Sequence, residues 1–361
     1  MEVKQKIDGN SKFEFIYSLL MLVLGFGVVA CFLVVIGFMI YVFNFMFIIF
    51  FLPLLIGIWV SIFRRSKDGY DTELHEKDGR KIMNLIENIC KKTGQKKPHK
   101  IIVTDGSEVA VTGFFRKKVI IGMVALRFMN EEDLLAILAH EYGHFANKDT
   151  ILGYFIYRIQ YFIEIQKSIS YEGVRDWSIS IIYLFQLAVY IPTYIFFWLF
   201  SKYFLLISLW YGRCVEFRAD NFASNLIGEQ NFAEALVKYC IIADIFDSVV
   251  PEHVLHYLKQ DKQIVNVYQY IKPLYSKENI KHGFNTVLSN KSSWWSTHPS
   301  ISERLELMNI KKVDIKFDPN LKDVLENQEK YEKEASEIMT YKMDYWLRLV
   351  ALAQQGYEVE D

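Results

Sequence analysis

The hydrophobic and polar positions of this chain fall into long blocks. Residues 15–63 contain no Asp, Glu, Lys or Arg over 49 positions, and Trp177–Ser201 is a second charge-free run of 25. A bilayer core needs ~20 apolar residues per helix. We therefore expect 13–63 to form a transmembrane helical hairpin that reverses near Tyr41–Asn44, and 151–212 to form a second membrane region.

The charges that flank the first block predict its orientation. A secretory signal peptide is the alternative for an N-terminal apolar run, but its apolar part is only ~7–15 residues long and ends at a cleavage site. No such site is evident, so we expect the hairpin to be retained. The reversal carries no charge, whereas basic residues flank both ends: Lys4, Lys6, Lys12, Arg64, Arg65 and Lys67. This predicts a cytoplasmic tail over 1–12 and a cytoplasmic segment after the hairpin.

The second membrane region is less uniform. Residues 151–168 contain Arg158 and Glu164, and Pro192 interrupts the apolar run that follows. Three arrangements are open: 151–168 and 177–200 form a hairpin, the later run folds back on itself at Pro192, or neither segment fully crosses. We prefer the hairpin, although each charge costs ~2.5–3.5 kcal/mol at the bilayer centre unless it faces protein or water. Alternatively, 151–168 lies along the interface as an amphipathic helix.

The remaining segments are polar enough to fold in water. HKIIVTDG (99–106) and KKVIIGMVAL (117–126) are typical of short strands, because β-branched residues dominate them. A helix is expected to begin at Asn130, a capping residue that three acidic residues follow. We expect a mainly α, α+β fold with a small β-sheet, in which 64–150 and 213–310 form two parts of one soluble domain. The charged segment 311–361 is expected to be a solvated helix that packs on this domain.

Composition narrows the class of protein further. Hydrophobic residues make up 52% of the chain and aromatic residues 16%, more than a soluble core usually needs. A net charge of −1 gives no reason to expect nucleic-acid binding. The cysteines lie far apart, which suits a reducing compartment and a role as core fillers rather than a disulfide framework: Cys31, Cys90, Cys214 and Cys240.

The clearest chemical signal is LLAILAHEYGHFANKDT, residues 134–150. On a helix, His140 and His144 differ by ~40° in direction and ~6 Å along the axis, so both can bind one ion. Glu141 is placed to take a proton from water activated by zinc and to hand it to a departing amine. With 8 His in 361 residues, an HExxH motif arises by chance in roughly one such chain in a hundred. The interpretation therefore needs a third ligand.

The segment RCVEFRADNFAS (213–224) offers that ligand. A catalytic zinc takes three protein ligands, and a carboxylate from another helix is one common solution. Glu216 can complete the site, and Asp220 can accept a hydrogen bond from the free ring nitrogen of a ligand histidine. The alternative is an ordinary solvated helix face. A shared ion also requires that the chain between His144 and Glu216 cross the membrane an even number of times.

Two other zinc-site patterns do not fit. The HExxHxxGxxH pattern fails because Asn147 and Thr150 stand at its Gly and third-His positions. An intramembrane metalloprotease would bury its motif within a long apolar helix, whereas this motif is bounded by the polar sequences NEED and NKD. The remaining type has two histidines and one glutamate, with the metal at the membrane surface.

Three motifs in order, EEDLLAILAHEYGHFANKDT, EFRAD and THPSISER, resemble the HtpX-like membrane zinc metalloproteases, which are related to the CAAX prenyl endopeptidases. The resemblance covers roughly residues 13–310. It implies a gluzincin-type protease domain with one Zn²⁺ per chain. The implied ligands are His140, His144 and Glu216, and the implied general base is Glu141. The resemblance implies that Asp220 hydrogen-bonds to a metal ligand without binding the metal itself.

The resemblance implies two further elements. His298 and Arg304 match an HPxxxxR element near the active site, so we expect His298 to stabilise the oxyanion and Arg304 to anchor the carboxylates. An HP dipeptide on its own is usually a turn. The family's substrate-pairing strand aligns with EVAVTG, where Glu108 replaces the usual Asn. An exposed edge binds peptide through its backbone, and we expect it at Val109, Ala110, Val111, Thr112 and Gly113.

The sequence therefore favours a zinc-dependent membrane endopeptidase that hydrolyses peptide bonds of membrane or misfolded proteins. Its expected location is the bacterial plasma (inner) membrane, with the catalytic domain facing the cytoplasm and with protein substrates and the lipid bilayer as partners. A prenyl-peptide processing endopeptidase is one alternative, which predicts more membrane helices around a chamber. A catalytically silent membrane scaffold of the same fold is the other. It predicts loss of the base or of a ligand, yet His140, Glu141, His144 and Glu216 are all present.

Overall fold

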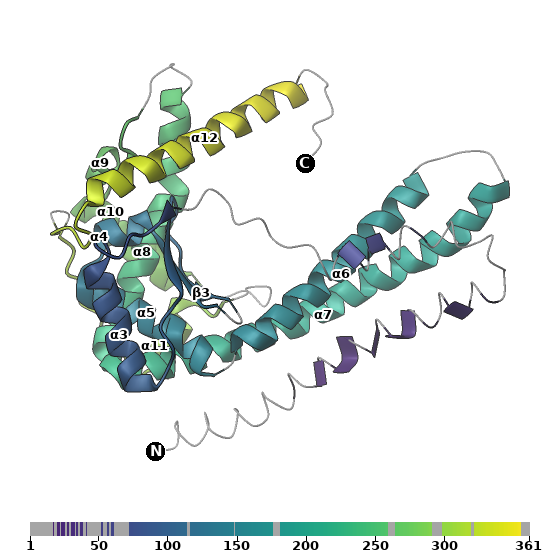
Figure 1. Ribbon diagram of the computed structural model, residues 1–361, viewed down its shortest axis with the longest axis horizontal. Helices are drawn as coiled ribbons and strands as arrows, with labels where there is room; N and C mark the ends of the chain where they lie inside the picture. The colour runs from purple at the N-terminus through teal and green to yellow at the C-terminus, as the bar shows by residue number, and fades with distance from the viewer. Residues whose placement is uncertain are drawn as a thin grey trace. The chain divides into compact units, whose positions relative to one another are not determined.

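The computed structural model describes residues 72–354 except 114–115, 148, 176–180, 259–263, 291–297 and 319–320, with scattered helical positions between 17 and 60. The tail 1–12 and most of the hairpin 13–63 lie outside the described residues and stay predictions. The chain divides into two compact units. Figure 1 colours the chain by residue number from the N-terminus to the C-terminus. The helical unit comprises Met1–Lys67, Asp149–Val215 and Ser293–His298, and the sheet unit comprises Asp68–Lys148, Glu216–Ser292 and Pro299–Asp361.

The sheet unit contains the expected small sheet. Its strands are β1 (Thr72–Glu73), β2 (Lys100–Thr104), β3 (Val109–Thr112) and β4 (Lys118–Gly122), in the order β1-β2-β4-β3. Strands β2 and β4 are parallel, and each outer strand is antiparallel to its neighbour. The central strand β2 is apolar and buried along nearly its whole length, as expected for a strand covered on both faces. At the other side of the sheet, β3 is an edge strand, as predicted for Val109–Gly113.

Helices supply most of the core of the sheet unit. The expected strand 117–126 is wrong in its second half, because β4 ends at Gly122 and the apolar residues that follow form a helix. That helix is fully buried, and a short apolar run does not by itself distinguish a buried helix from a strand. The helices are α3 (Arg80–Thr93), α4 (Met123–Phe128), α5 (Glu131–Ala146), α8 (Glu229–Leu258), α9 (Val267–Tyr270), η2 (Lys272–Leu274), α10 (Lys277–Ser289), α11 (Ile301–Leu307) and α12 (Gln328–Gln354).

Helix α5 begins where its sequence predicts. The Asn130 side chain accepts a hydrogen bond from the Asp133 N–H at 2.8 Å, and Asp133 accepts one from the Asn130 N–H at 3.2 Å. This capping box satisfies backbone donors that a helix start leaves without partners. The helix packs against α3, α8 and β3, so its position in the sheet unit is fixed from several sides.

Helix α5 also meets the end of α7 (Ile181–Ile227) at a glycine. A Cβ placed on Gly143 would lie 3.0 Å from Ala219 Cα, 3.2 Å from Ala219 O and 3.2 Å from Phe222 Cβ. Two of these atoms are backbone, so they cannot turn aside as a flexible side chain would. The absence of a side chain at Gly143 therefore permits close approach of the two helices.

The helical unit contains an antiparallel pair formed by α6 (Asp149–Arg175) and α7, which run side by side in Figure 1. The rings of Phe162 and Phe197 lie 5.5 Å apart, and those of Tyr171 and Tyr194 lie 6.1 Å apart. Rising residue numbers on α6 thus meet falling numbers on α7, which is the chain path of the preferred hairpin. Helix α7 continues through Pro192, so the alternative in which the chain folds back at this proline is wrong.

Hydropathy marks part of α7 as a candidate membrane span. Among the described residues, Val189–Ile227 is the one helical stretch long and apolar enough to cross a membrane. Within α6, Glu164 is exposed and forms an ion pair with Lys167 at 2.8 Å. The crossing of α6 and α7 through a bilayer stays a prediction.

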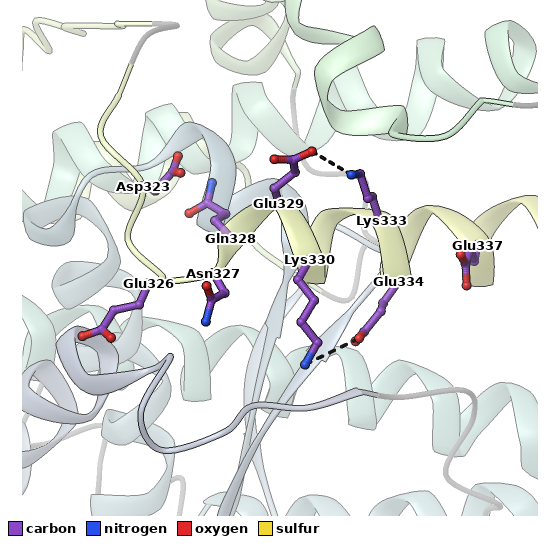
Figure 2. A pocket seen from close by; sticks show the side chains of 9 residues that line it. All are labelled: Asp323, Glu326, Asn327, Gln328, Glu329, Lys330, Lys333, Glu334 and Glu337. Carbon is purple, nitrogen blue, oxygen red and sulfur yellow. Dashed lines mark ion pairs between the residues drawn. The ribbon is translucent and has the colours of Figure 1, made fainter.

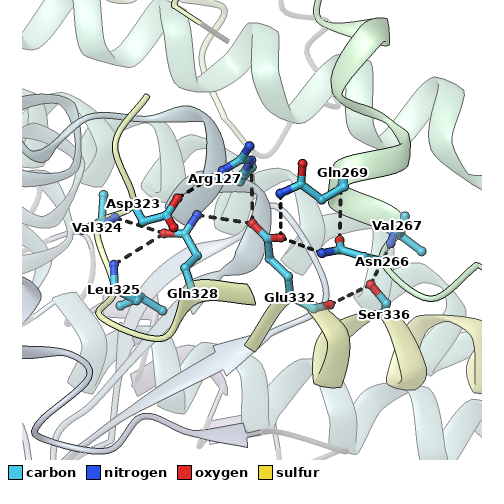
Figure 3. A network of polar contacts seen from close by, with 10 residues as sticks. All are labelled: Arg127, Asn266, Val267, Gln269, Asp323, Val324, Leu325, Gln328, Glu332 and Ser336. Atoms are coloured by element: carbon cyan, nitrogen blue, oxygen red, sulfur yellow. Dashed lines mark hydrogen bonds and ion pairs between the residues drawn. The ribbon is translucent and has the colours of Figure 1, made fainter. Parts of the chain in front are cut away.

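Helix α12 is joined to the sheet unit by the buried polar network of Figure 3. Glu332 is only 1% exposed, lies 3.7 Å from Arg127 Nε, and accepts a hydrogen bond from Asn266 Nδ2 at 2.7 Å. One turn further on, Ser336 Oγ accepts a hydrogen bond from the Val267 N–H at 2.9 Å. The charged extension thus contains a helix packed within the sheet unit, and one of its acidic residues is part of the interior.

The opposite face of the first turns of α12 is a solvated surface. An open hollow there is lined by Asp323, Glu326, Asn327, Gln328, Glu329, Lys330, Lys333, Glu334 and Glu337 (Figure 2). Its lysines form ion pairs along the helix, Lys333 with Glu329 at 2.7 Å and Lys330 with Glu334 at 3.8 Å. Such i,i+4 pairs contribute only a few tenths of a kcal/mol. The hollow is therefore ordinary helix surface.

We expect Gly143→Ala to separate α5 from α7, because the new methyl group meets backbone atoms of Ala219. The free energy of unfolding should fall by about 1–3 kcal/mol, as for other overpacked sites. The control is Gly153→Ala in α6, where a Cβ meets nothing within 4 Å. There the same change should be neutral or stabilising by about 0.5–1 kcal/mol. Thermal unfolding of the two variants in the same detergent provides the comparison, and equal transition temperatures would contradict the proposed close contact.

Glu332→Ala should lower the free energy of unfolding by about 3–5 kcal/mol, because it leaves Arg127 buried without this partner. The matched control is Glu334→Ala, two residues along the same helix. Glu334 pairs with Lys330 at a solvated surface, so its loss should cost no more than about 1 kcal/mol. Denaturant unfolding followed by tryptophan fluorescence distinguishes the two. A Glu332 variant as stable as the Glu334 variant would show that α12 is not held by this network.

Candidate metal centre

Helix α5 presents two imidazoles from adjacent turns. The ring centroids of His140 and His144 are 4.9 Å apart, and the ring planes meet at 86°. His140 is buried, whereas His144 keeps some exposure. The spacing of four residues thus places both rings on one side of the helix, as the sequence predicts.

Helix α7 brings a carboxylate to the same place. Glu216 Oε2 lies 3.4 Å from His140 Nε2, and Glu216 Oε1 lies 3.8 Å from His144 Nε2. One ligand atom from each of the three side chains lies within 4.8 Å of the others. Two donors bonded to a tetrahedral zinc at ~2.0–2.1 Å stand ~3.3 Å apart, and a His₂Glu set is a known catalytic zinc combination. The three residues therefore fit a zinc ion.

Asp220 and Arg304 orient this set. Asp220 Oδ1 lies 3.0 Å from His140 Nδ1. Arg304 Nε donates to Asp220 Oδ2 at 2.8 Å, its Nη2 donates to Oδ1, and its Nη1 lies 3.5 Å from Glu216 Oε2. A proton held on Nδ1 leaves Nε2 as the nitrogen that offers a lone pair toward Glu216. The structure thus brings Asp220 and Arg304 together with His140 and Glu216, and their supporting roles stay predictions.

The electrostatics of the cluster favour positive charge. Burial by itself lowers the pKa of His140, but the Asp220 and Glu216 carboxylates outweigh it and raise that pKa to about 9. Burial similarly opposes ionisation of Asp220, yet Arg304 and His140 hold its pKa below the usual range. The pKa of Arg304 is raised by the same carboxylates against the effect of burial. The carboxylates that stabilise this proton would also attract a divalent cation.

Glu141 faces both the histidines and the sheet. Burial raises the pKa of its carboxyl group, although His140 and His144 oppose the rise. The Val111 N–H also faces the carboxylate and lowers its pKa. Glu141 thus connects the candidate metal site with edge strand β3, and its raised pKa suits a group that takes up and releases a proton.

Helix α8 supplies residues near the site that the sequence motifs do not identify. The buried ring of Phe232 stacks on His140, with centroids 5.9 Å apart and planes 12° from parallel. Tyr239, seven residues later, accepts a hydrogen bond from the Val109 N–H at 3.1 Å. The spacing of seven places both on one helix face. A buried helix has many such pairs, so spacing alone could not have distinguished this one.

His298 differs from the other predicted site residues in the unit to which it belongs. It is part of the helical unit, whereas the others are part of the sheet unit. Its side chain is exposed. Ser300, two residues later, caps α11 in a capping box with Glu303. The HPxxxxR element thus includes the start of the helix that carries Arg304. The oxyanion role of His298 stays a prediction.

The described geometry agrees with comparisons to known proteins. Residues 76–311 match the model of the family described as peptidase family M48. Protease HtpX of Stenotrophomonas maltophilia (strain K279a) is 27% identical over 194 residues, which are 52% of this chain and 66% of that protein. A protease HtpX homolog of Bacteroides fragilis (strain ATCC 25285) is 32% identical over 82 residues, or 22% of this chain and 26% of that one.

Among solved structures, the crystal structure of S. mikatae Ste24p is similar with a TM-score of 0.41 and 16% identity, over 83% of this chain and 66% of that one. The chain spans just under two thirds of the Stenotrophomonas relative it matches. The family match itself covers well over half of the chain and includes the histidine pair, Glu216 and Arg304. The chain belongs to peptidase family M48.

Proposed function

We propose that this protein is a zinc-dependent endopeptidase that hydrolyses peptide bonds of membrane or misfolded proteins at the cytoplasmic surface of a bacterial plasma membrane. One observation carries the proposal. Two imidazoles of α5 and the Glu216 carboxylate of α7 converge within 4.8 Å, and the half-buried Glu141 neighbours both histidines. Family membership and the donor set both support zinc as the ion, with one per chain.

The side chains divide the chemistry among them. Zinc, when bound, supplies a Lewis acid that polarises a carbonyl group and lowers the pKa of water. Glu141 takes the proton of the attacking water on its carboxylate and delivers it to the nitrogen of the departing amine. His298 donates a hydrogen bond to the developing oxyanion. Arg304 holds Asp220 and Glu216 in place through its hydrogen bonds and its ion pair.

The substrate is an extended peptide along β3. Edge strands bind extended chains through their backbone groups, and β3 is an edge of the sheet. The Val111 N–H faces the Glu141 carboxylate, which places this edge next to the proposed base. Residues Val109–Gly113 are thus the proposed substrate-binding strand.

The membrane location rests on hydropathy and on the α6/α7 pair. The charge-free blocks, the candidate span Val189–Ile227 and the antiparallel path of the two helices all support insertion into a bilayer. An antiparallel pair returns the chain to the side from which it left. This is the condition for His144 and Glu216 to share an ion.

The two alternatives have less support. A catalytically silent scaffold has no need of a base and three ligands, whereas all four side chains are present and clustered. A prenyl-peptide processing enzyme predicts several membrane helices around a chamber. The described residues contain one candidate span, which gives that alternative no specific observation in its favour.

Purified protein should contain about one zinc per chain, because three oriented donors suit a catalytic zinc. His140→Ala should reduce the zinc content to near zero and abolish cleavage. A chelator should abolish cleavage by the parent protein, and added zinc should restore it. Metal analysis together with a casein or self-cleavage assay measures both. Full cleavage by a zinc-free preparation would contradict the proposed metal dependence.

Glu141→Gln should retain the zinc but lower kcat by about 10²–10⁴-fold, because the amide cannot accept the proton of water. Glu334→Ala serves as the control, since it lies on the solvated face of α12 and should leave cleavage unchanged. Cleavage of a membrane substrate in proteoliposomes gives the rate. Should the Gln variant cleave as fast as the parent protein, Glu141 is not the base.

A further inference from the structure

The backbone of β3 alternates between its two sides. Gly122 N donates to Glu108 O at 2.6 Å, and the register pairs Val109 with Ile121 and Val111 with Val119. In an antiparallel pair, residues that exchange hydrogen bonds alternate with residues whose backbone groups face away from the partner. The N–H and C=O groups of Val109 and Val111 therefore face the free edge.

Two side chains of different chemistry meet these outward donors. The Val111 N–H faces the Glu141 carboxylate closely enough to lower its pKa. The Val109 N–H donates to the Tyr239 hydroxyl at 3.1 Å. A strand rises ~3.4 Å per residue, so these two contacts lie ~7 Å apart along the edge. A phenol hydroxyl and the proposed base thus occupy neighbouring positions along the edge to which a peptide would add.

The Tyr239 hydroxyl still has a proton to donate. Within the described part of the chain, its hydrogen bond is the one it accepts from Val109. Burial raises the pKa of Tyr239, so the group stays protonated at neutral pH. Val109 and Val111 already anchor β3 through buried side chains, so the hydroxyl is not needed to hold the strand. Its position at the edge suits a partner that offers a carbonyl oxygen.

We infer that Tyr239 is a substrate-positioning residue: its hydroxyl blocks further strand pairing at the Val109 N–H and donates a hydrogen bond to one backbone carbonyl of the peptide. The peptide N–H groups then bond to the outward carbonyls of Val109 and Val111. Because Tyr239 sits two residues along the edge from the contact of Glu141, the bound carbonyl determines which peptide bond reaches the base. The inference rests on the proposed function and specifies the register of its substrate.

The test is Tyr239→Phe, which keeps the ring and removes the hydroxyl. With a set of extended peptides, KM should rise roughly fivefold for loss of one neutral hydrogen bond while kcat stays within about twofold. Mass spectrometry of the products should show additional cleavage positions displaced by two residues, because the pleat repeats every two residues. Zinc content should equal that of the parent protein.

The matched control is Tyr275→Phe. Tyr275 is buried and its hydroxyl donates to the Ile242 carbonyl of α8 at 3.2 Å, not to β3. Its removal should lower thermal stability slightly and leave KM and the cleavage positions unchanged. A general loss of packing would affect both variants alike, whereas loss of register is expected in the Tyr239 variant alone.

A scan of the substrate adds a second measurement. Peptides in which one amide at a time is replaced by an alkene isostere lose one carbonyl and one N–H each. Among the positions that carry a KM penalty with the parent protein, one of roughly fivefold should be absent with Tyr239→Phe, whereas penalties from lost N–H groups should persist in both. A scan without such a position, or identical cleavage patterns in parent and variant, overturns the positioning role alone. A parent protein that cleaves no peptide overturns the proposed function, and the positioning role with it.

Discussion

The close approach of α5 and α7 at Gly143 is the contact on which the candidate site depends. The ligand atoms of His140 and His144 lie on one helix and that of Glu216 on another, and side chains of this length reach a common ion only if the helices nearly touch. A methyl group at position 143 would lie 3.0 Å from the Cα of Ala219. The glycine between the two histidines thus has a structural role, because it sets the distance across which the candidate metal ligands meet.

The two helices that meet at Gly143 come from separate parts of the sequence. Helix α5 ends at Ala146, and α7 runs 47 residues before it ends at Ile227. The intervening α6/α7 pair returns the chain, so that the carboxylate and the histidines belong to the same compact unit. The proposed membrane segment is therefore inserted between two stretches of chain that form the sheet unit.

Around the histidines, Arg304 offsets part of the negative charge of the carboxylates. Arg304 makes two hydrogen bonds to Asp220, and Asp220 lies 3.0 Å from His140 Nδ1. Removal of either member would leave its partner buried and charged, which costs several kcal/mol. On the opposite side, Glu141 and Tyr239 meet successive outward donors of β3. The same strand edge thus links the proposed base to the proposed substrate register.

The sequence by itself determined the local features of this protein, and the tertiary structure decided how they meet. Helical spacing placed His140 beside His144, a capping residue marked the start of α5, and motif order pointed to Glu216, Asp220 and Arg304. The first two follow from interactions within a few residues, which the sequence pattern shows directly, whereas the third rests on the resemblance to a known family. The apolar run after Gly122 became α4 and not a strand, α7 passed through Pro192, and Tyr239 reached the edge of β3. Those outcomes depend on which neighbours cover each segment, and the neighbours come from distant parts of the chain. The sequence pattern within one segment gives no information about these distant neighbours.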